Sequence, residues 1–154
     1  MHGVMPMAVQ DYLIDHTHYD WPNLLVGWTW LLPPKFTVWL VNRFGDLFLV
    51  LPDDSIHLLD LGAGTLTKLA DSQDEFCHKI DEGENAIKWL MIPLVDRLVA
   101  ADGRPPAGFC YSFRVLPVLG GQPTVENTIV RAIVDHYRTY GTVHGQLRNA
   151  REQT

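Results

Sequence analysis

Cysteine is scarce in this sequence. The 154 residues include only Cys77 and Cys110, and neither lies in a Cys-x-x-Cys pair or another metal-ligand spacing. This scarcity argues against a disulfide-stapled secreted scaffold and against a cysteine-based zinc site. Two buried thiols in a reducing compartment are the simplest interpretation, and a disulfide between them is the alternative that only the fold can decide.

Long hydrophobic runs are also missing. The longest cover residues 24–32, interrupted by Gly27 and Thr29, and residues 47–51. A membrane-spanning helix needs about 20 apolar residues, so neither run can cross a bilayer. The first ten residues have neither the cationic start nor the apolar stretch of a signal peptide. We therefore expect a cytoplasmic protein with no membrane partner.

Positive charge is sparse in the middle of the chain. Between Asp46 and Glu84 there are ten acidic residues and only two basic ones, a net charge of −8, whereas the remainder has ten bases and eight acids, a net charge of +2. Phosphate contacts require Lys and Arg, so this stretch is unsuited to direct binding of nucleic acid. It suits a basic protein partner, whose approach the carboxylates would steer. The alternative is that the acids only decorate turns and a helix start.

Eight carboxylates of this stretch are the candidate partner-binding residues, each acting as an electrostatic anchor or steering charge for a basic partner. They are Asp53, Asp54, Asp71, Asp74, Glu75, Asp81, Glu82 and Glu84.

Short β-rich segments separated by turn residues predict an antiparallel meander. The expected strands are residues 36–42, 47–51, 56–61 and 65–69. Strands this close in sequence must pair antiparallel, because a parallel crossover needs about a dozen residues. Two further strands are expected downstream, over residues 109–116 and 126–132, a helix being the alternative for the second.

Helical spacing predicts the remaining elements. We expect helices over residues 8–15, 24–32, 71–80, 90–101 and 134–148. The fold class is therefore α+β: an antiparallel β-meander packed by helices, with a C-terminal helix. The expected organisation is a short N-terminal segment, residues 1–20, followed by a single domain over residues 21–150.

No pattern of residues indicates catalysis or metal binding. His16-Thr17-His18 is flanked by two aspartates, but no second cluster offers ligands at a diagnostic spacing. Asp53-Asp54-Ser55 is better explained as a hairpin turn than as a calcium loop. Ser112 and Cys77 lack the surroundings of an activated nucleophile, and Gly120-Gly121 indicates a tight backbone turn. We therefore expect a non-enzymatic protein without cofactor, catalytic residues or metal ligands.

Trp28, Trp30 and Trp39 leave a second functional class open. Without interleaved Arg or Lys, core packing is the better explanation for them. If instead they lined one pocket, the protein would be a small-ligand-binding or sensor domain.

Several spaced motifs resemble a bacterial domain family. The motifs are residues 42–48 (NRFGDLF), 56–60 (IHLLD), 69–72 (LADS) with Glu75-Phe76, 108–113 (GFCYSF), 117–121 (PVLGG), Glu126-Asn127 and 143–147 (VHGQL). In this order they resemble the family named for the C-terminal domain of a type VI secretion immunity protein that neutralises a DNase toxin, formerly a domain family of unknown function. The resemblance covers residues 24–148.

The resemblance implies a non-enzymatic fold and a role in blocking a toxin delivered between bacteria. Relatives often carry an additional upstream domain, where this sequence has about 20 residues. The motif residues are mostly glycine, apolar residues and turn acids, which serve as scaffold, so the resemblance assigns no functional site. The predicted function is an immunity-type protein that binds and neutralises a cognate, basic toxin domain, with a nuclease as the candidate class of toxin.

Overall fold

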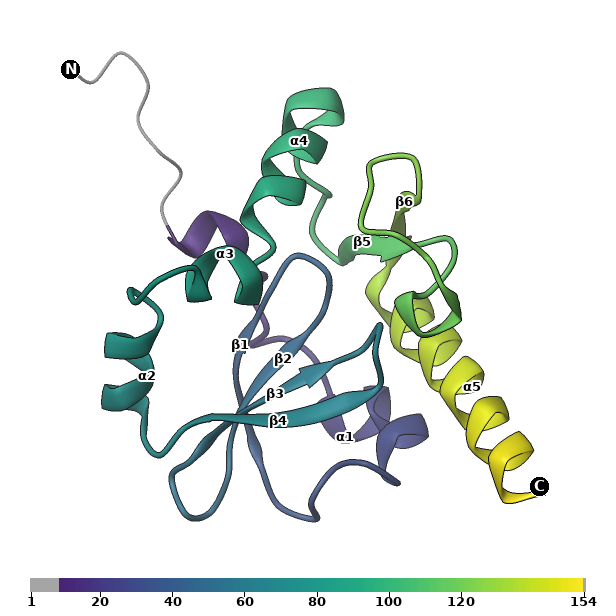
Figure 1. Cartoon of the computed structure of the whole chain (residues 1–154), viewed down its shortest axis with the longest axis horizontal. Helices are drawn as coiled ribbons and strands as arrows, with labels where there is room; N and C mark the ends of the chain where they lie inside the picture. The colour runs from purple at the N-terminus through teal and green to yellow at the C-terminus, as the bar shows by residue number, and fades with distance from the viewer. Residues whose placement is uncertain (1–8, 154) are drawn as a thin grey trace.

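The centre of the molecule is an antiparallel meander whose strands are separated by short polar turns. The computed structural model describes residues 9–153 and pairs β1 (Thr37–Val41), β2 (Leu47–Val50), β3 (Ile56–Asp60) and β4 (Thr65–Ala70) in the order of the chain (Figure 1). A second sheet pairs β5 (Phe109–Phe113) with β6 (Thr128–Ala132). The predicted α+β meander is thus confirmed.

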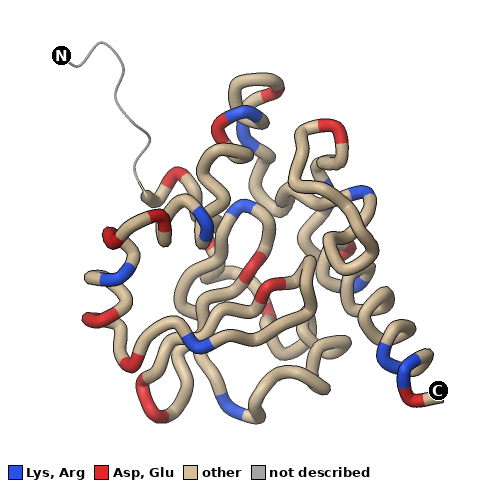
Figure 2. Tube along the Cα trace, viewed as in Figure 1, with Lys and Arg blue, Asp and Glu red and all other residues tan. Residues whose placement is uncertain are grey.

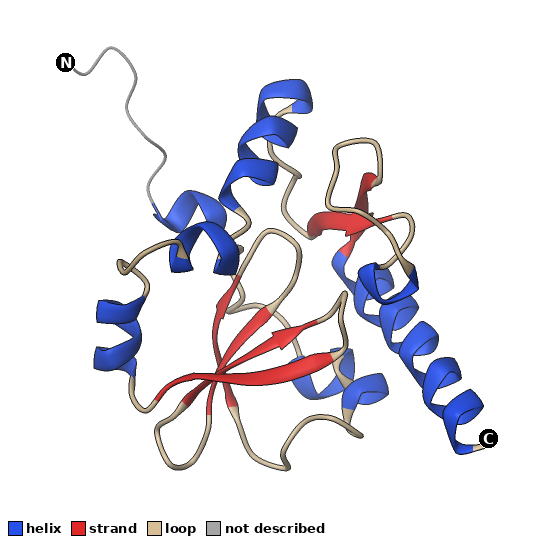
Figure 3. Cartoon of the chain, in the orientation of Figure 1, coloured by secondary structure: helices blue, strands red, loops and turns tan. Residues whose placement is uncertain are grey.

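Helices cover both faces of the four-stranded sheet. α2 (Gln73–Lys79), α3 (Asn85–Trp89) and α4 (Ile92–Asp102) follow β4, and α5 (Ile133–Glu152) follows β6. Figure 3 shows α2, α3 and α4 on one side of the sheet, with α5 and the short α1 (Trp21–Leu24) on the other. No helix within residues 9–153 is long and apolar enough to cross a bilayer.

The sequence of β2 shows why the sheet needs two helical layers. Successive side chains of a strand point to opposite faces, and here both sets are apolar. Leu47 and Leu49 enter one hydrophobic cluster with Trp28 and residues of α5, while Phe48 lies in the other cluster. All three are fully buried. A strand buried on both faces therefore appears as a continuous apolar run rather than an alternating one.

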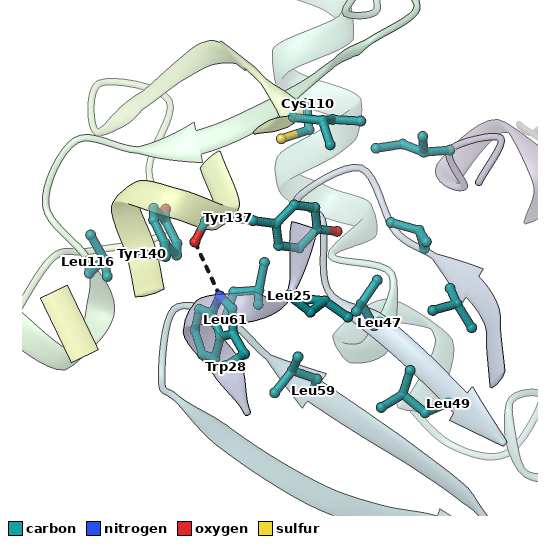
Figure 4. Packing of buried hydrophobic residues seen from close by; sticks show 14 residues of the cluster. Leu25, Trp28, Leu47, Leu49, Leu59, Leu61, Cys110, Leu116, Tyr137 and Tyr140 are labelled. Carbon is teal, nitrogen blue, oxygen red and sulfur yellow. Dashed lines mark hydrogen bonds between the residues drawn. The ribbon is translucent and has the colours of Figure 1, made fainter. Parts of the chain in front are cut away.

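Glycine in the middle of α5 allows that helix to approach the chain near Trp28. A Cβ added to Gly141 would lie 3.3 Å from Trp28 Nε1 and 3.6 Å from the Cα of Gly27. Trp28 is fully buried and its Nε1 donates to the carbonyl oxygen of Tyr137 at 3.2 Å (Figure 4). The glycine that weakens helix propensity is here a contact residue, and α5 runs to Glu152, beyond the expected end at residue 148.

The expected helix over residues 24–32 is wrong. Asp20 caps a short α1 by accepting from the backbone N–H of Asn23, and the helix ends at Leu24. A 3₁₀ turn, Val26–Trp28, follows, and Trp28 is buried while Val26 is 70% exposed. Gly27 and the need to insert one tryptophan into the core break the regular helix here.

The expected helix over residues 8–15 is also wrong, although residue 8 lies outside the described part. Val9–Tyr12 form a 3₁₀ turn, in which Val9 is exposed and Tyr12 is buried. The chain then becomes extended, since Leu13 bridges to Asn42 and the N–H of Ile14 donates to Val41. Pairing with the edge of β1 therefore overrides the local helical pattern.

Other boundaries differ by a few residues. The helix expected at residues 90–101 starts at Ile92, because Met91 adopts a left-handed φ of 53° that separates it from α3, which the sequence did not predict. β5 ends at Phe113 rather than at residue 116. Cys77 is exposed and Cys110 is buried, and both are free thiols, so the expectation that both would be buried was wrong.

Candidate functional site

The eight candidate carboxylates come together along one side of the molecule. They belong to three consecutive surface segments: the turn between β2 and β3, the start of α2, and the loop between α2 and α3. Figure 2 shows these acidic positions along the left side, where few basic ones intervene. Seven are exposed and Glu75 is half-buried. We call this set the acidic edge.

The turn between β2 and β3 fixes the first two carboxylates. Asp53 Oδ1 accepts hydrogen bonds from the backbone N–H of Ser55 at 3.0 Å and from its hydroxyl at 2.5 Å. These two donors lower the pKa of Asp53, so its charge persists at neutral pH. Asp54 adopts a left-handed φ of 70°, which aspartate tolerates in a tight turn. The turn thus presents its charges from a defined backbone.

The start of α2 positions the next group. Ser72 is the N-cap and its hydroxyl accepts from the backbone N–H of Glu75 at 3.0 Å, while Glu75 Oε1 accepts from the N–H of Asp71 at 3.1 Å. This reciprocal arrangement is similar to a capping box, and it places the acids at the positive end of the helix dipole. The helix start therefore holds the carboxylate of Glu75 through a backbone contact.

Two lysines neutralise part of this group. Lys68 Nζ lies 2.5 Å from Asp71 Oδ1, and Lys79 Nζ lies 3.0 Å from Glu75 Oε1. Each lysine, by its hydrogen bond, lowers the pKa of its carboxylate partner. Eight acids and two lysines leave the acidic edge with a net charge of −6.

The acidic edge has two parts. Asp53 interacts electrostatically with both Lys68 and Asp71, so the β2–β3 turn and the start of α2 form one charged patch. Asp81, Glu82 and Glu84 follow the other end of the seven-residue α2, which is about 10 Å long. Only the folded chain brings residues 53 and 71 together.

Two acids counted in the acidic stretch do not belong to this surface. Asp46 is 9% exposed, and its carboxylate accepts from the backbone N–H of Leu61 at 3.0 Å and from Asn42 Nδ2 at 3.1 Å. Burial, and then the nearby Asp60, raise the pKa of Asp46. Asp60 is half-buried at the end of β3. The net charge of −8 read from the sequence therefore overstates the charge that a partner meets.

The Asn42–Asp46 turn carried a signal that the sequence analysis missed. Asn42 Oδ1 accepts from the backbone N–H groups of Phe44 and Asp46, both at 3.0 Å, and Gly45 supplies a positive φ of 80°. An Asn followed by a Gly and an Asp within four residues is typical of such a side-chain-stabilised turn. Asp46 is therefore a structural residue.

The candidate metal and catalytic residues are dispersed. His18 Nε2 lies 3.6 Å from Asp15 on the surface, and the part of the chain that the structure describes contains no group of three or more His, Cys, Asp or Glu that could hold a metal. Ser112 Oγ lies 2.9 Å from His136 Nδ1, a pair that the sequence analysis did not foresee. Both residues are fully buried, so the pair lies in the core.

The three tryptophans do not line one pocket. Trp28 lies in the cluster beneath α5, where its ring stacks on Trp30, whereas Trp39 contacts Phe76 on the other side of the sheet. A cavity of about 910 Å³ is lined by other residues, including Trp21, Leu25, Leu32 and Phe36. The pocket expected for a sensor domain is thus not built from the residues proposed for it.

Comparison with known proteins relates the chain to immunity proteins. Residues 70–143 match the model of the family described as "T6SS immunity protein Tdi1, C-terminal". This match confirms, over that segment, the resemblance seen in the sequence motifs, and it supports a type VI secretion immunity role. No curated protein matches the sequence.

A solved structure shares the fold. The crystal structure of Atu4351 from Agrobacterium tumefaciens is similar with a TM-score of 0.57 and 16% sequence identity, over 86% of this chain and 67% of that one. At this identity the similarity establishes the shared fold alone.

Proposed function

From the family match over residues 70–143, we propose that this protein is a non-enzymatic immunity protein that binds and neutralises a cognate toxin domain through its acidic edge. A nuclease is the toxin that best fits this surface. An enzyme that cuts nucleic acid must attract phosphates, so its active face is rich in Lys and Arg. A surface of fixed carboxylates would cover such a face.

The observation that carries this proposal is the way the carboxylates are held. Asp53, Asp71 and Glu75 keep their charge because neighbouring donors lower the pKa of each. The turn and the helix cap fix their backbones, so little conformational freedom is lost on binding. Complementary charge of this kind mainly accelerates association and makes it dependent on salt.

Charge reversal of the acidic edge tests the proposal. The fourfold variant Asp53→Lys, Asp54→Lys, Asp74→Lys and Glu75→Lys should slow association with the toxin domain and flatten its salt dependence. The probe is the cognate toxin domain, identified from the neighbouring genes or by pull-down with this chain, and association is measured by stopped-flow or surface plasmon resonance. Thermal melts of the variant confirm that it is folded.

A matched control changes the same charge elsewhere. Four exposed acids outside the acidic edge are Asp102, Glu126, Asp135 and Glu152. Reversing these four to Lys alters the net charge equally and should leave most of the salt dependence intact. If both variants associate alike, net charge rather than the acidic edge governs binding. If neither the variant nor the unmodified chain binds or inhibits the toxin, the immunity function is refuted.

The apolar cavity keeps a ligand-binding function as the second candidate. Its volume of about 910 Å³ is in the range of small-molecule sites, and Pro33, Pro34 and Lys35 lie at its wall. Saturable quenching of tryptophan fluorescence by an apolar probe such as a fatty acid, abolished by Leu32→Arg, would support it. A probe that leaves the fluorescence unchanged would remove this candidate.

A further inference from the structure

The two edges of the four-stranded sheet are not alike. β1 forms one edge, and the N-terminal chain covers part of it through the Leu13–Asn42 bridge and the hydrogen bond from the N–H of Ile14 to Val41. β4 forms the other edge. Within residues 9–153, no backbone hydrogen bond joins Thr65–Leu69 to anything other than β3.

The open part of this edge is short and has a defined end. The register passes from Lys68 opposite His57 to Ala70 opposite Ile56, so Leu69 is the extra residue of a β-bulge. The carbonyl oxygen of Leu69 accepts from Lys79 Nζ at 3.2 Å, which occupies that position of the edge. The stretch Thr65–Lys68 is left, about 13 Å of strand.

The side chains of this stretch suit an added strand. Thr65, Thr67 and Lys68 are exposed, whereas Leu66 packs into the core and anchors β4. Threonine is β-branched and favours cross-strand contacts. Lys68 is paired with Asp71, so its charge is already engaged.

Part of the acidic edge, the patch formed by the β2–β3 turn and the start of α2, lies at the C-terminal end of β4. Asp71 follows β4 directly. Asp53 and Glu75 both interact electrostatically with Lys68, and Asp53 also interacts with Asp71. An extended chain that paired with Thr65–Lys68 would bring its end residues beside these carboxylates. The unpaired backbone groups of Thr65–Lys68 and the nearby carboxylates therefore both fit one kind of ligand, an extended segment with basic residues at its end.

We infer that β4 receives an extended, basic segment of the toxin as a fifth strand of the sheet, with its terminal Arg or Lys beside Asp71. This inference rests on the proposed immunity function and names the mode of binding. Main-chain hydrogen bonds supply affinity in such strand addition, and side chains at the ends supply specificity.

A synthetic peptide tests the inference directly. The probe is acetyl-Arg-Arg-Thr-Val-Thr-Val-Arg-Arg-amide, titrated into the ¹⁵N-labelled full chain and followed by amide chemical shifts and hydrogen exchange. The expected result is saturable binding, with shift changes centred on Thr65–Lys68 and Asp71 and slowed exchange of the outward-facing amides of β4. The same peptide with Glu in place of Arg should not bind.

Two N-methylated peptides separate strand pairing from charge attraction. An added strand bonds β4 through the N–H groups of every second residue, while the alternate groups face solvent. Methylating one alternate set should therefore leave binding unchanged, and methylating the other should weaken it by about tenfold or more. If both methylated peptides bind as well as the parent, the attraction is electrostatic only and the inference is overturned, as it is if the parent peptide does not bind.

A substitution pair and the toxin itself complete the test. Asp71→Asn should weaken peptide binding several-fold, whereas the control Asp135→Asn, at an exposed acid on α5, should not. In the toxin complex, the outward amides of β4 should become protected. A toxin that binds and is neutralised while these amides stay unprotected would refute the inference and leave the immunity function standing.

Discussion

Gly121 offers the sharpest test of how the loop after β5 is built. A Cβ added to Gly121 would lie 1.7 Å from the carbonyl oxygen of Val115 and 2.5 Å from its carbonyl carbon. Real Cβ atoms do not approach a backbone this closely, so Gly121→Ala requires one of the two segments to move. The neighbouring Gly120 differs, because its φ of 93° is unusual for other residues but its surroundings are open.

The loop has little freedom to relieve this clash. Asn127 holds Val115 from both sides: Asn127 Nδ2 donates to the Val115 carbonyl at 2.9 Å, and its Oδ1 accepts from the Val115 N–H at 3.0 Å. The N–H of Gly121 donates to Leu116 at 3.0 Å. Moving the loop breaks two or three hydrogen bonds at about 1 kcal/mol each. We therefore expect Gly121→Ala to lower the free energy of unfolding by about 2–4 kcal/mol.

Gly120→Ala should cost less, about 1 kcal/mol, because only the left-handed backbone is strained. In a domain of this length, about 2–4 kcal/mol corresponds to a fall in Tm of about 4–16 °C. Gly145→Ala is the control: within residues 9–153, apart from the neighbouring residues and the nearby backbone of α5 itself, nothing lies within 4 Å of the added Cβ, so it should stabilise by about 0.5–1 kcal/mol. Denaturant titrations measure all three. A Gly121→Ala protein as stable as the unmodified chain, or less affected than Gly120→Ala, would refute this account.

Three further predictions concern a helix cap, a buried histidine and the core. Ser72→Ala removes the N-cap of α2 and should cost about 1 kcal/mol in denaturant titrations. Burial lowers the pKa of His136 to about 3, so between about pH 6.5 and 3 the unfolded chain binds a proton that the folded chain does not, and the free energy of unfolding falls as the pH drops. His136→Gln should reduce the slope of unfolding free energy against pH by the equivalent of up to one proton. An unchanged slope in the variant would contradict this account. Trp28→Ala empties a fully buried site and should cost about 3–5 kcal/mol, and a loss below about 1 kcal/mol would show that the core closes around it.

The order of the elements was predictable because local signals agreed with the tertiary fold. Turn residues such as Pro52 and Gly62 separate short apolar segments, and segments so close in sequence can only pair antiparallel. The start of α2 was predictable for the same reason, because Ser72 is a typical N-cap residue and does cap this helix in the structure. The charge excess of the acidic edge is likewise a property of composition. The partner-binding role assigned to its eight residues remains a prediction.

The errors fall where contacts distant in sequence decide the local structure. The segment around Val26 has helical spacing, but the insertion of Trp28 beneath α5 breaks it. Core packing, the preferred explanation for the three tryptophans, holds, but the alternative of one shared pocket does not, because the sheet separates Trp39 from the other two. These outcomes depend on which face of the sheet each segment covers, and no short window of sequence contains that information.

The α+β class, the meander, the C-terminal helix and the acidic middle could all be derived from the sequence. Each of these follows from spacing, turn chemistry or composition, which act between near neighbours. Three features became visible only in the fold: Asp46 is buried and does not contribute to the charged surface, residues 53 and 71 share one patch, and β4 forms an edge of the sheet. These features depend on burial and on distances between segments that are far apart in the chain. The interaction of two charges depends on their distance in space, and a carboxylate is desolvated only when the folded chain surrounds it.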